Sequence, residues 1–406
     1  MSPCHPVTLS RGIVLLIVLA FALRLGGMLH PHTIFSDIGL NSNNIEAFTV
    51  GNVYFTEGLP SEAGGGQAPY PPGQVIVLAP GQFLVPANDE GRKLLVKIGN
   101  ALLDSLVVGL LWLVLRRAGA GQRAALFGAA LYLAPTPLLN SFSIGEFANI
   151  FGQGLTMPLL ALLAIGGPGD VQTLRRGVSA GGGEQRAGEH IGSPLRHGRW
   201  MFAVALLGMA LLGHLGVAIS LAAMLASLAV LSLLVPRARG AFVPLIVVGI
   251  IAVAFVALFY YSAFAQLLFE RFAGTAEGMT SAPQALSLAE KMARQGRLLV
   301  ISPLLLGLGT TGALLARRTL QGMWLQLLLG AWWLGTLLSF GLLLFANQAV
   351  RWQHFLYPAL CLGGGLALAA LWRRGRAGRL VVITTLLFIV GQSVAWWFER
   401  LMNAYH

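Results

Sequence analysis

Charged residues are scarce in this sequence: they make up 10% of its 406 residues, whereas hydrophobic residues make up 56% and the mean hydropathy is +0.73. Soluble globular domains carry about 25% charged residues. The shortage excludes a soluble domain as the whole fold. It predicts an all-α polytopic membrane protein, for which the lipid bilayer is the main solvent.

Lysine and cysteine are rarer still. Arginine supplies 24 of the 27 basic residues, and the arginines stand in short clusters between apolar runs. A nucleic-acid-binding protein would gather them with aromatic residues on a polar surface, so we expect no nucleic-acid partner. Two cysteines, Cys4 and Cys361, are too few for a disulfide framework. The preference for arginine over lysine suggests a bacterial source.

The familiar catalytic motifs are missing too. The sequence has no HExxH, no CxxC, no phosphate-binding Walker loop and no Gly-x-Ser-x-Gly. Its few acids do not by themselves define a metal site. No cofactor is therefore indicated with certainty, and a divalent cation stays open as an alternative.

Long apolar runs are what the sequence has in abundance. A membrane helix needs about 20 mostly apolar residues. Eleven runs approach this length: 12–30, 94–115, 123–139, 148–166, 200–213, 215–235, 241–263, 298–316, 321–346, 353–372 and 379–397. Residues 74–86 are apolar but short and broken by Pro80 and Gly81, so we expect them to lie at the membrane surface or to re-enter it.

The arginine clusters orient these spans. If 74–86 does not cross the membrane, most of the clusters fall on the same side as Arg11, as the positive-inside rule requires. This predicts an integral protein of the bacterial plasma membrane with a cytoplasmic N-terminus and an external C-terminus. The long loop 31–93 then lies outside and is expected to contain juxtamembrane helices.

The loop between the fourth and fifth spans suggests a division of the chain. Residues 167–199 are rich in Gly, Arg and Ser and have almost no apolar content, so they cannot bury a core. We interpret them as a flexible cytoplasmic linker. It separates an N-terminal membrane module (1–166) from a C-terminal transmembrane module (200–406).

Two acids on the expected outer face are candidates for catalysis. Asp37 follows the first span, and Glu146 stands where the chain re-enters the membrane. Asp37 could act as a base or orient a ligand, and Glu146 could act as an acid, a base or a metal ligand. The alternatives are a solvated loop acid or helix cap for Asp37 and a helix-start acid for Glu146. Asn41 and Asn44, just after Asp37, suit a polyhydroxyl or phosphate ligand but equally suit a turn.

The same face carries candidate cations. His214 interrupts an apolar segment, and Arg351 and His354 stand at the mouth of the tenth span. Ionisable groups at membrane depth are functional candidates, and Arg suits bidentate phosphate binding. Interfacial anchoring is the alternative for each. Lys97 and Asp104 lie on one face of the second span, and we expect them to neutralise one another.

The order of these features resembles the GT-C superfamily of membrane glycosyltransferases, which includes protein O-mannosyltransferases and lipid A aminoarabinose transferase. A first span is followed by an outer loop with an early acid, Asp37, and a Tyr-Pro-Pro step at residues 70–72. The polar segment GEFANIFGQG opens the fourth span. The features that carry the resemblance further are Arg116-Arg117, the APTP segment at 134–137, Gly213-His214 and the stretch from Arg351 to Pro358.

The resemblance implies a function and roles for the candidate residues. Members take sugar from a polyprenyl-phosphate donor, and their first-loop acid acts as base or orients the acceptor; by position that acid is Asp37. Glu146 would be the second catalytic acid. The residues that would bind the donor phosphate or substrate are Arg351, His354, His214, Tyr70, Asn41 and Asn44. The implied partners are a lipid-linked sugar donor, membrane lipids and an acceptor that the sequence does not identify.

Two departures leave other functions open. Ile38 follows Asp37 where the family often has a second acid, and Glu146 stands where an Asp is common. A non-catalytic GT-C-like subunit that binds a partner is therefore one alternative. A lipid or solute transporter is the other, although it would need polar groups lining a path through the bundle.

Overall fold

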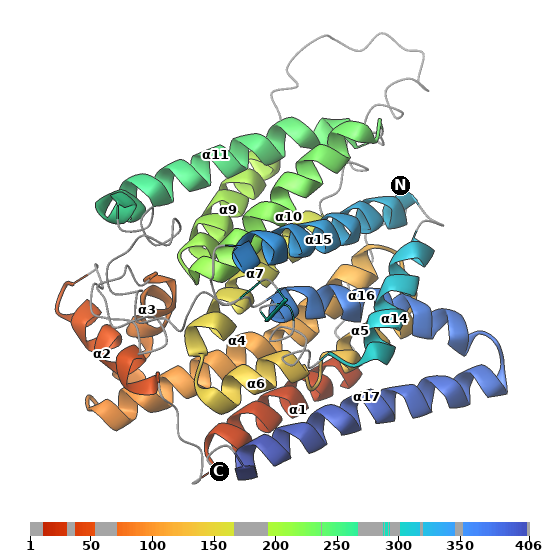
Figure 1. Ribbon diagram of the computed structural model, residues 1–406, viewed down its shortest axis with the longest axis horizontal. Helices are drawn as coiled ribbons and strands as arrows, with labels where there is room; N and C mark the ends of the chain where they lie inside the picture. The colour runs from red at the N-terminus through yellow and green to blue at the C-terminus, as the bar shows by residue number, and fades with distance from the viewer. Residues whose placement is uncertain are drawn as a thin grey trace.

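The structure is a computed structural model, and it describes residues 11–30, 37–52, 71–165, 194–236, 238–266, 287, 289–290, 292, 301–316, 320–345 and 352–403. In these residues every regular element is a helix. The long helices lie side by side as one bundle (Figure 1). The predicted all-α membrane architecture is confirmed.

The long helices follow the apolar runs of the sequence closely. They are α1 (Arg11–Met28), α4 (Asp89–Arg117), α5 (Gly121–Leu131), α6 (Thr136–Ile144), α7 (Phe147–Ile165), α9 (Pro194–Leu211), α10 (Leu215–Leu234), α11 (Phe242–Phe259), α14 (Pro303–Leu315), α15 (Leu320–Phe345), α16 (Trp352–Trp372) and α17 (Arg376–Asn403). Most of the expected linker 167–199 lies outside the described residues, and α9 begins before its predicted end.

The number of spans depends on the length that is required. Within the described residues, nine helical segments are long and apolar enough to cross a membrane, and α5 and α6 together count as one of them. The apolar part of α9 (Trp200–Leu211) and α14 are shorter apolar helices. These two correspond to the predicted spans 200–213 and 298–316, so each of the eleven predicted spans contains a described helix, but not every helix is of full length.

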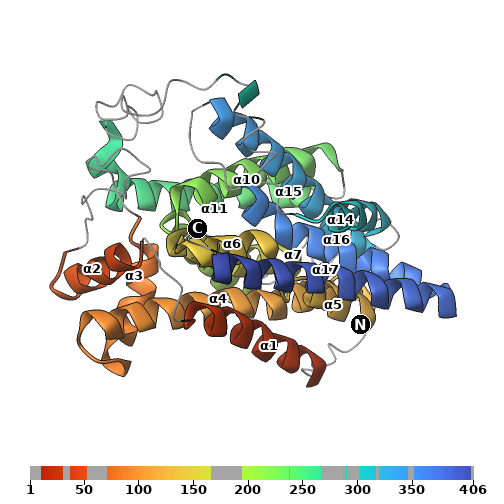
Figure 2. The ribbon, with the colours of Figure 1, turned by 60° about the horizontal axis from the view of Figure 1, so that its bottom comes forward.

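Short helices fill the first long loop. α2 (Ile38–Thr49) follows α1, and α3 (Gly73–Leu78) continues into the 3₁₀ helix η2 (Ala79–Leu84). The apolar segment from Gly73 to Leu84 is too short to span a membrane. α2 and α3 lie together at one end of the bundle, beside the start of α4 (Figures 1 and 2). We call this end, with its loops, the α2 end.

Burial separates central from peripheral helices. In α7, 78% of the membrane-length window is buried inside the protein, and in α16 the share is 72%. In α11 and α17 it is only 22%, and their exposed residues are mostly apolar. α7 and α16 therefore form the centre, whereas α11 and α17 present apolar side chains to lipid.

Glycines allow the central helices to approach closely. A Cβ atom on Gly312 of α14 would clash with the backbone carbonyl of Gly363 on α16, and one on Gly363 would clash with Gly309. α10 and α15 cross in the same way at Gly335 and Met224. Small residues at contacts are the usual means of packing helices in membranes, where burial from water does not drive association.

A buried ion pair joins α1 to α4 and corrects one expectation. Arg24 donates from Nε to Asp104, and both side chains are fully buried. Tyr132 Oη donates to the other oxygen of Asp104 at 2.7 Å. Asp104 is thus neutralised by Arg24 and not by Lys97. Lys97 lies two helical turns away on the same helix, about 10 Å along the axis.

The two ends of the bundle carry different charges. The arginines at the ends of α4, α5, α16 and α17 away from α2 are Arg116, Arg117, Arg123, Arg373, Arg374, Arg376 and Arg379. The acids Asp37, Glu46, Asp89, Glu90, Glu146 and Glu399 lie at the α2 end. α1 begins at the arginine-rich end, and α17 finishes at the α2 end (Figure 1).

Candidate active site

Polar contacts fix α2 against the start of α4. Ser42 Oγ donates to Asp89 at 2.6 Å, and Arg92 donates to Ser42 at 3.2 Å and to Glu46 at 2.6 Å. Glu46 is exposed and Arg92 largely buried. The loop after α1 therefore holds a defined position over the bundle, and with it the residues that the sequence singled out.

Asp37 occupies the N-cap position of α2, but its side chain makes no capping bond to the helix. Its carbonyl accepts a hydrogen bond from Asn41 Nδ2 at 2.7 Å. Asn44, one turn on, is 3% exposed, and its Nδ2 has no hydrogen-bond partner among the described residues. Asp37 therefore stands where the alternative role of helix cap would place it, at the start of a helix that begins at Ile38, but its side chain supplies no capping bond.

Glu146 belongs to a hydrogen-bonded cluster that also contains His354. The chain turns sharply between α6 and α7 at Gly145, whose φ of 82° lies in the left-handed region that favours glycine. Ser141 Oγ lies 2.6 Å from Glu146 Oε2 and 2.9 Å from His354 Nε2. His354 Nε2 also lies 2.8 Å from the carbonyl oxygen of Pro137.

The acceptors in this cluster determine where the protons lie. The Pro137 carbonyl can only accept, so His354 Nε2 carries a proton. Ser141 Oγ donates its proton to Glu146 Oε2, so it receives the proton of His354 Nε2. In a Ser-His-acid hydrolase triad, the histidine accepts from the serine and the acid binds the other ring nitrogen. Here the direction is reversed, so the cluster holds an acid and does not activate a serine.

His214 lies at the same end of the bundle, in the turn between α9 and α10. Its Nδ1 accepts a hydrogen bond from Gly216 N at 3.2 Å, which caps α10 and leaves the ring proton on Nε2. Its Cβ packs against Gly152 of α7. The adjacent Leu212 carbonyl accepts from Gly73 N at 2.8 Å, so this turn also supports α3.

The structure brings together some of the predicted site residues and leaves others apart. Glu146 and His354 are joined through Ser141. Asp37, Asn41 and Asn44 share α2, and His214 lies against α7. Tyr70 and Arg351 lie outside the described residues.

A divalent cation does not fit the described part of this site. No three His, Cys, Asp or Glu side chains in the described ranges gather closely enough to hold one. We therefore derive no chemical step through a metal.

Sequence reasoning missed Ser141, which connects the two predicted residues. It also missed the bracing of this region by α17, where Arg400 donates to Asn140 at 3.0 Å. A signal for Ser141 was present: it stands five residues before Glu146, in a short polar segment between apolar runs.

Comparison with known proteins supplies the fold. No protein-family model matches the sequence, and no curated protein matches it either. Among solved structures, ArnT from Cupriavidus metallidurans bound to undecaprenyl phosphate matches with a TM-score of 0.59 and 15% identity, over 97% of this chain and 78% of that one. The oligosaccharyltransferase of Archaeoglobus fulgidus in the apo form matches with a TM-score of 0.55 and 14% identity, over 95% of this chain. Both are GT-C glycosyltransferases.

The chain has a GT-C-like fold. The resemblance drawn from the order of sequence features is thereby confirmed at the level of the fold. The present chain spans about 55% of the length of the oligosaccharyltransferase. That protein has also been solved with an inhibitory peptide and a dolichol-phosphate. At 14–15% identity these matches establish architecture and leave activity to be argued from the site.

Proposed function

We propose that this protein is a membrane glycosyltransferase that moves a sugar from a polyprenyl-phosphate donor to an acceptor hydroxyl. The observation that supports this most is the match over 97% of the chain to a protein solved with undecaprenyl phosphate. A lipid-phosphate donor also suits the layout, because its tail can stay among the apolar helices while its head reaches the polar α2 end.

In this proposal Asp37 is the general base. Its carboxylate takes the proton of the acceptor hydroxyl, and the acceptor oxygen forms a bond to the anomeric carbon of the sugar. The bond between that carbon and the phosphate oxygen breaks, and its electron pair leaves with the polyprenyl phosphate. A single displacement of this kind inverts the anomeric centre. General-base catalysis of this type contributes about 10²–10⁴-fold in rate.

Glu146 is the second acid of the proposed site. The hydrogen bonds that join it to Ser141 and His354 indicate that His354 positions this acid. Because His354 Nε2 donates toward Ser141 and Pro137, we propose that His354 orients Glu146 through Ser141. We then propose that Arg351 and His214 bind the departing phosphate. Such a contact stabilises the charge that develops on the leaving group.

The remaining residues of α2 would complete the donor site. Asn41 and Asn44 follow Asp37 by one and two turns, and Asn44 Nδ2 is a buried donor without a partner in the described ranges. A phosphate or sugar oxygen is a suitable acceptor for it. Tyr70, which precedes α3 in the sequence, is proposed as a further contact.

The charge distribution supports an orientation for this site. The arginine-rich end of the bundle would face the cytoplasm of a bacterium, and the α2 end would face the periplasm or the exterior. The N-terminus would then be cytoplasmic and the C-terminus external. The acceptor is accordingly proposed to be an envelope molecule.

The experiment is a transfer assay with the purified protein in lipid and a small panel of polyprenyl-phosphate sugars. Loss of sugar from the donor is followed for wild type, for Asp37→Asn and for Glu399→Gln. Glu399 is an exposed acid at the same end and serves as the matched control. We expect turnover by wild type and by the control, and a loss of at least about 100-fold for Asp37→Asn.

Other outcomes separate the rival functions. Equal turnover by all three proteins would keep the activity and reject Asp37 as its base. No turnover by wild type, with retained binding of polyprenyl phosphate, would favour a non-catalytic subunit. Movement of the intact lipid or of a solute across the vesicle membrane without sugar release would favour a transporter.

A further inference from the structure

Three buried amide side chains in the bundle interior have unused hydrogen-bond acceptors. They are Asn100 of α4, which is fully buried, Gln153 of α7, also fully buried, and Asn149 of α7, which is 8% exposed. In each one the side-chain carbonyl oxygen has no hydrogen-bond partner in the part of the chain that the structure describes. Buried polar groups are nearly always partnered, so three such atoms in neighbouring helices call for a ligand or for water.

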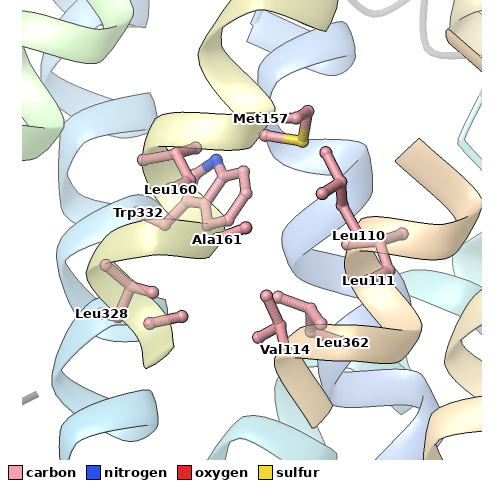
Figure 3. A pocket seen from close by; sticks show the side chains of 10 residues that line it. Leu110, Leu111, Val114, Met157, Leu160, Ala161, Leu328, Trp332 and Leu362 are labelled. Atoms are coloured by element: carbon pink, nitrogen blue, oxygen red, sulfur yellow. The ribbon is translucent and has the colours of Figure 1, made fainter. Parts of the chain in front are cut away.

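The amides lie on the helix faces that line an apolar cavity. Figure 3 shows this cavity between α4, α7, α15 and α16, with Met157 at one end of it. Gln153 precedes Met157 by one turn and the lining residue Leu160 by two, and its Nε2 lies 4.0 Å from Met157 Sδ. Asn100 precedes the lining residue Leu111 by three turns. Residues at such spacings share one face of an α-helix.

The amides also lie at one level of the bundle. Leu103 of α4 packs against Gly154 of α7, where a Cβ atom would lie 2.5 Å from Leu103 Cγ. Since α4 and α7 both run away from the α2 end, Asn100 lies beside the stretch from Asn149 to Gln153. The three amides therefore stand nearer the α2 end than the cavity does.

The cluster around Glu146 approaches the same interior. Trp332 lines the cavity, and its Nε1 donates to the carbonyl of Phe355 at 2.6 Å. Phe355 is next to His354, which contacts Ser141. Passing from the α2 end inward, the protein thus presents the Glu146 cluster, then the amides, and then an apolar cavity.

The chemistry of the unused atoms selects the ligand. Asn100 Nδ2 donates to the Val96 carbonyl, so Oδ1 is the atom of this amide that is left over. All three unpartnered atoms are therefore acceptors, which repel a phosphate and attract hydroxyl groups. We propose that Asn100, Asn149 and Gln153 form a subsite for the hydroxyl groups of the transferred sugar, separate from the phosphate contact. This inference rests on the proposed function and adds the sugar-binding residues to it.

Comparing two ligands tests the subsite. Binding of bare polyprenyl phosphate and of the same carrier bearing a sugar is measured for wild type and for Gln153→Met, which keeps the side-chain volume and removes the acceptor. We expect the sugar-bearing carrier to bind about three- to tenfold more weakly, the loss of one hydrogen bond, and the bare carrier to bind as before. Without ligand, the variant should melt at a higher temperature than wild type, because a buried unpartnered group is removed.

Gln74→Met is the matched control. Gln74 is a buried glutamine whose side-chain polar atoms have no partner among the described residues, and it belongs to α3 and not to α4 or α7. We expect it to leave the preference for the sugar-bearing carrier unchanged. Asn149→Leu provides a second variant if Gln153→Met does not fold, with the same expectation.

Three results would overturn the inference. Unchanged binding of both ligands would show that the amides hold only water. Equal weakening of both ligands would show a structural effect without sugar recognition. If wild type bound neither carrier, the proposed function itself would fail, which distinguishes that failure from failure of the subsite.

Discussion

The buried ion pair between Arg24 and Asp104 allows a quantitative test of how α1 is held in the bundle. Replacing Arg24 with Met leaves the fully buried Asp104 without its positive partner. Removing one member of a buried pair costs about 3–5 kcal/mol, because the remaining charge stays buried and uncompensated. We expect Arg24→Met to lose about that much unfolding free energy.

The double variant sharpens the test. Arg24 also donates to the carbonyls of Ala20, Leu133 and Tyr132, whereas Asp104 accepts only from Arg24 and Tyr132 among the described contacts. Arg24→Met with Asp104→Leu removes both charges, so much of the single-variant loss should return. The part that does not return, about 1–3 kcal/mol, would report the carbonyls left without their donor.

Unfolding is followed by tryptophan fluorescence in detergent for wild type, both single variants and the double variant. Non-additivity is the quantity of interest, because groups in direct contact couple strongly. A double variant as unstable as the sum of the two singles would refute the reasoning, and so would a wild-type melting temperature for Arg24→Met alone.

Two further predictions follow from close contacts. Gly312→Val should prevent stable folding, because even a Cβ atom there would clash with the Gly363 carbonyl. Gly307→Val is the control, since it lies on the same helix with open space around its Cα. Equal recovery of both folded variants from detergent would contradict the prediction. Ser141→Ala should lower kcat for sugar transfer while leaving KM and the melting temperature nearly unchanged, because Ser141 links Glu146 to His354. Ser141→Thr keeps the hydroxyl and should restore kcat. Failure of that rescue would assign Ser141 a packing role instead.

The membrane helices could be predicted from the sequence because length and apolarity alone specify them. Apolar content also showed that the stretch near Pro80 does not span, since it is too short to cross. Exact length was harder: α14 begins at Pro303, several residues after the predicted start of its span. The proline at the start of the helix and Ser302 before it marked that boundary.

The contacts between helices could not be predicted in the same way. Lys97 and Asp104 appeared to be partners because they are near in the sequence, but Asp104 binds Arg24, eighty residues away. The missed signal was energetic: an arginine in the first apolar run and an aspartate in the second each needed a partner of opposite charge at membrane depth.

The candidate site was predictable only in part. The order of segments placed Glu146 and His354 at one end of the bundle, and the structure shows that they share Ser141. The interior amides were not predicted, because one polar residue in an apolar span gives no indication of the direction in which it points. That direction depends on how α4 and α7 pack.

The closing contact of the bundle has a consequence for biosynthesis. α17 contacts α1 through Trp397, which packs against Gly27 and whose indole nitrogen donates to the Leu23 carbonyl at 3.3 Å. Of the described helices, α1 leaves the ribosome first and α17 leaves it last. α1 therefore obtains this neighbour only after α17 has been made. Until then the Gly27 side of α1 must be covered by lipid, by the insertion machinery or by a chaperone. A nascent chain stalled before α17 would therefore display an unclosed bundle, a state that membrane quality control could recognise.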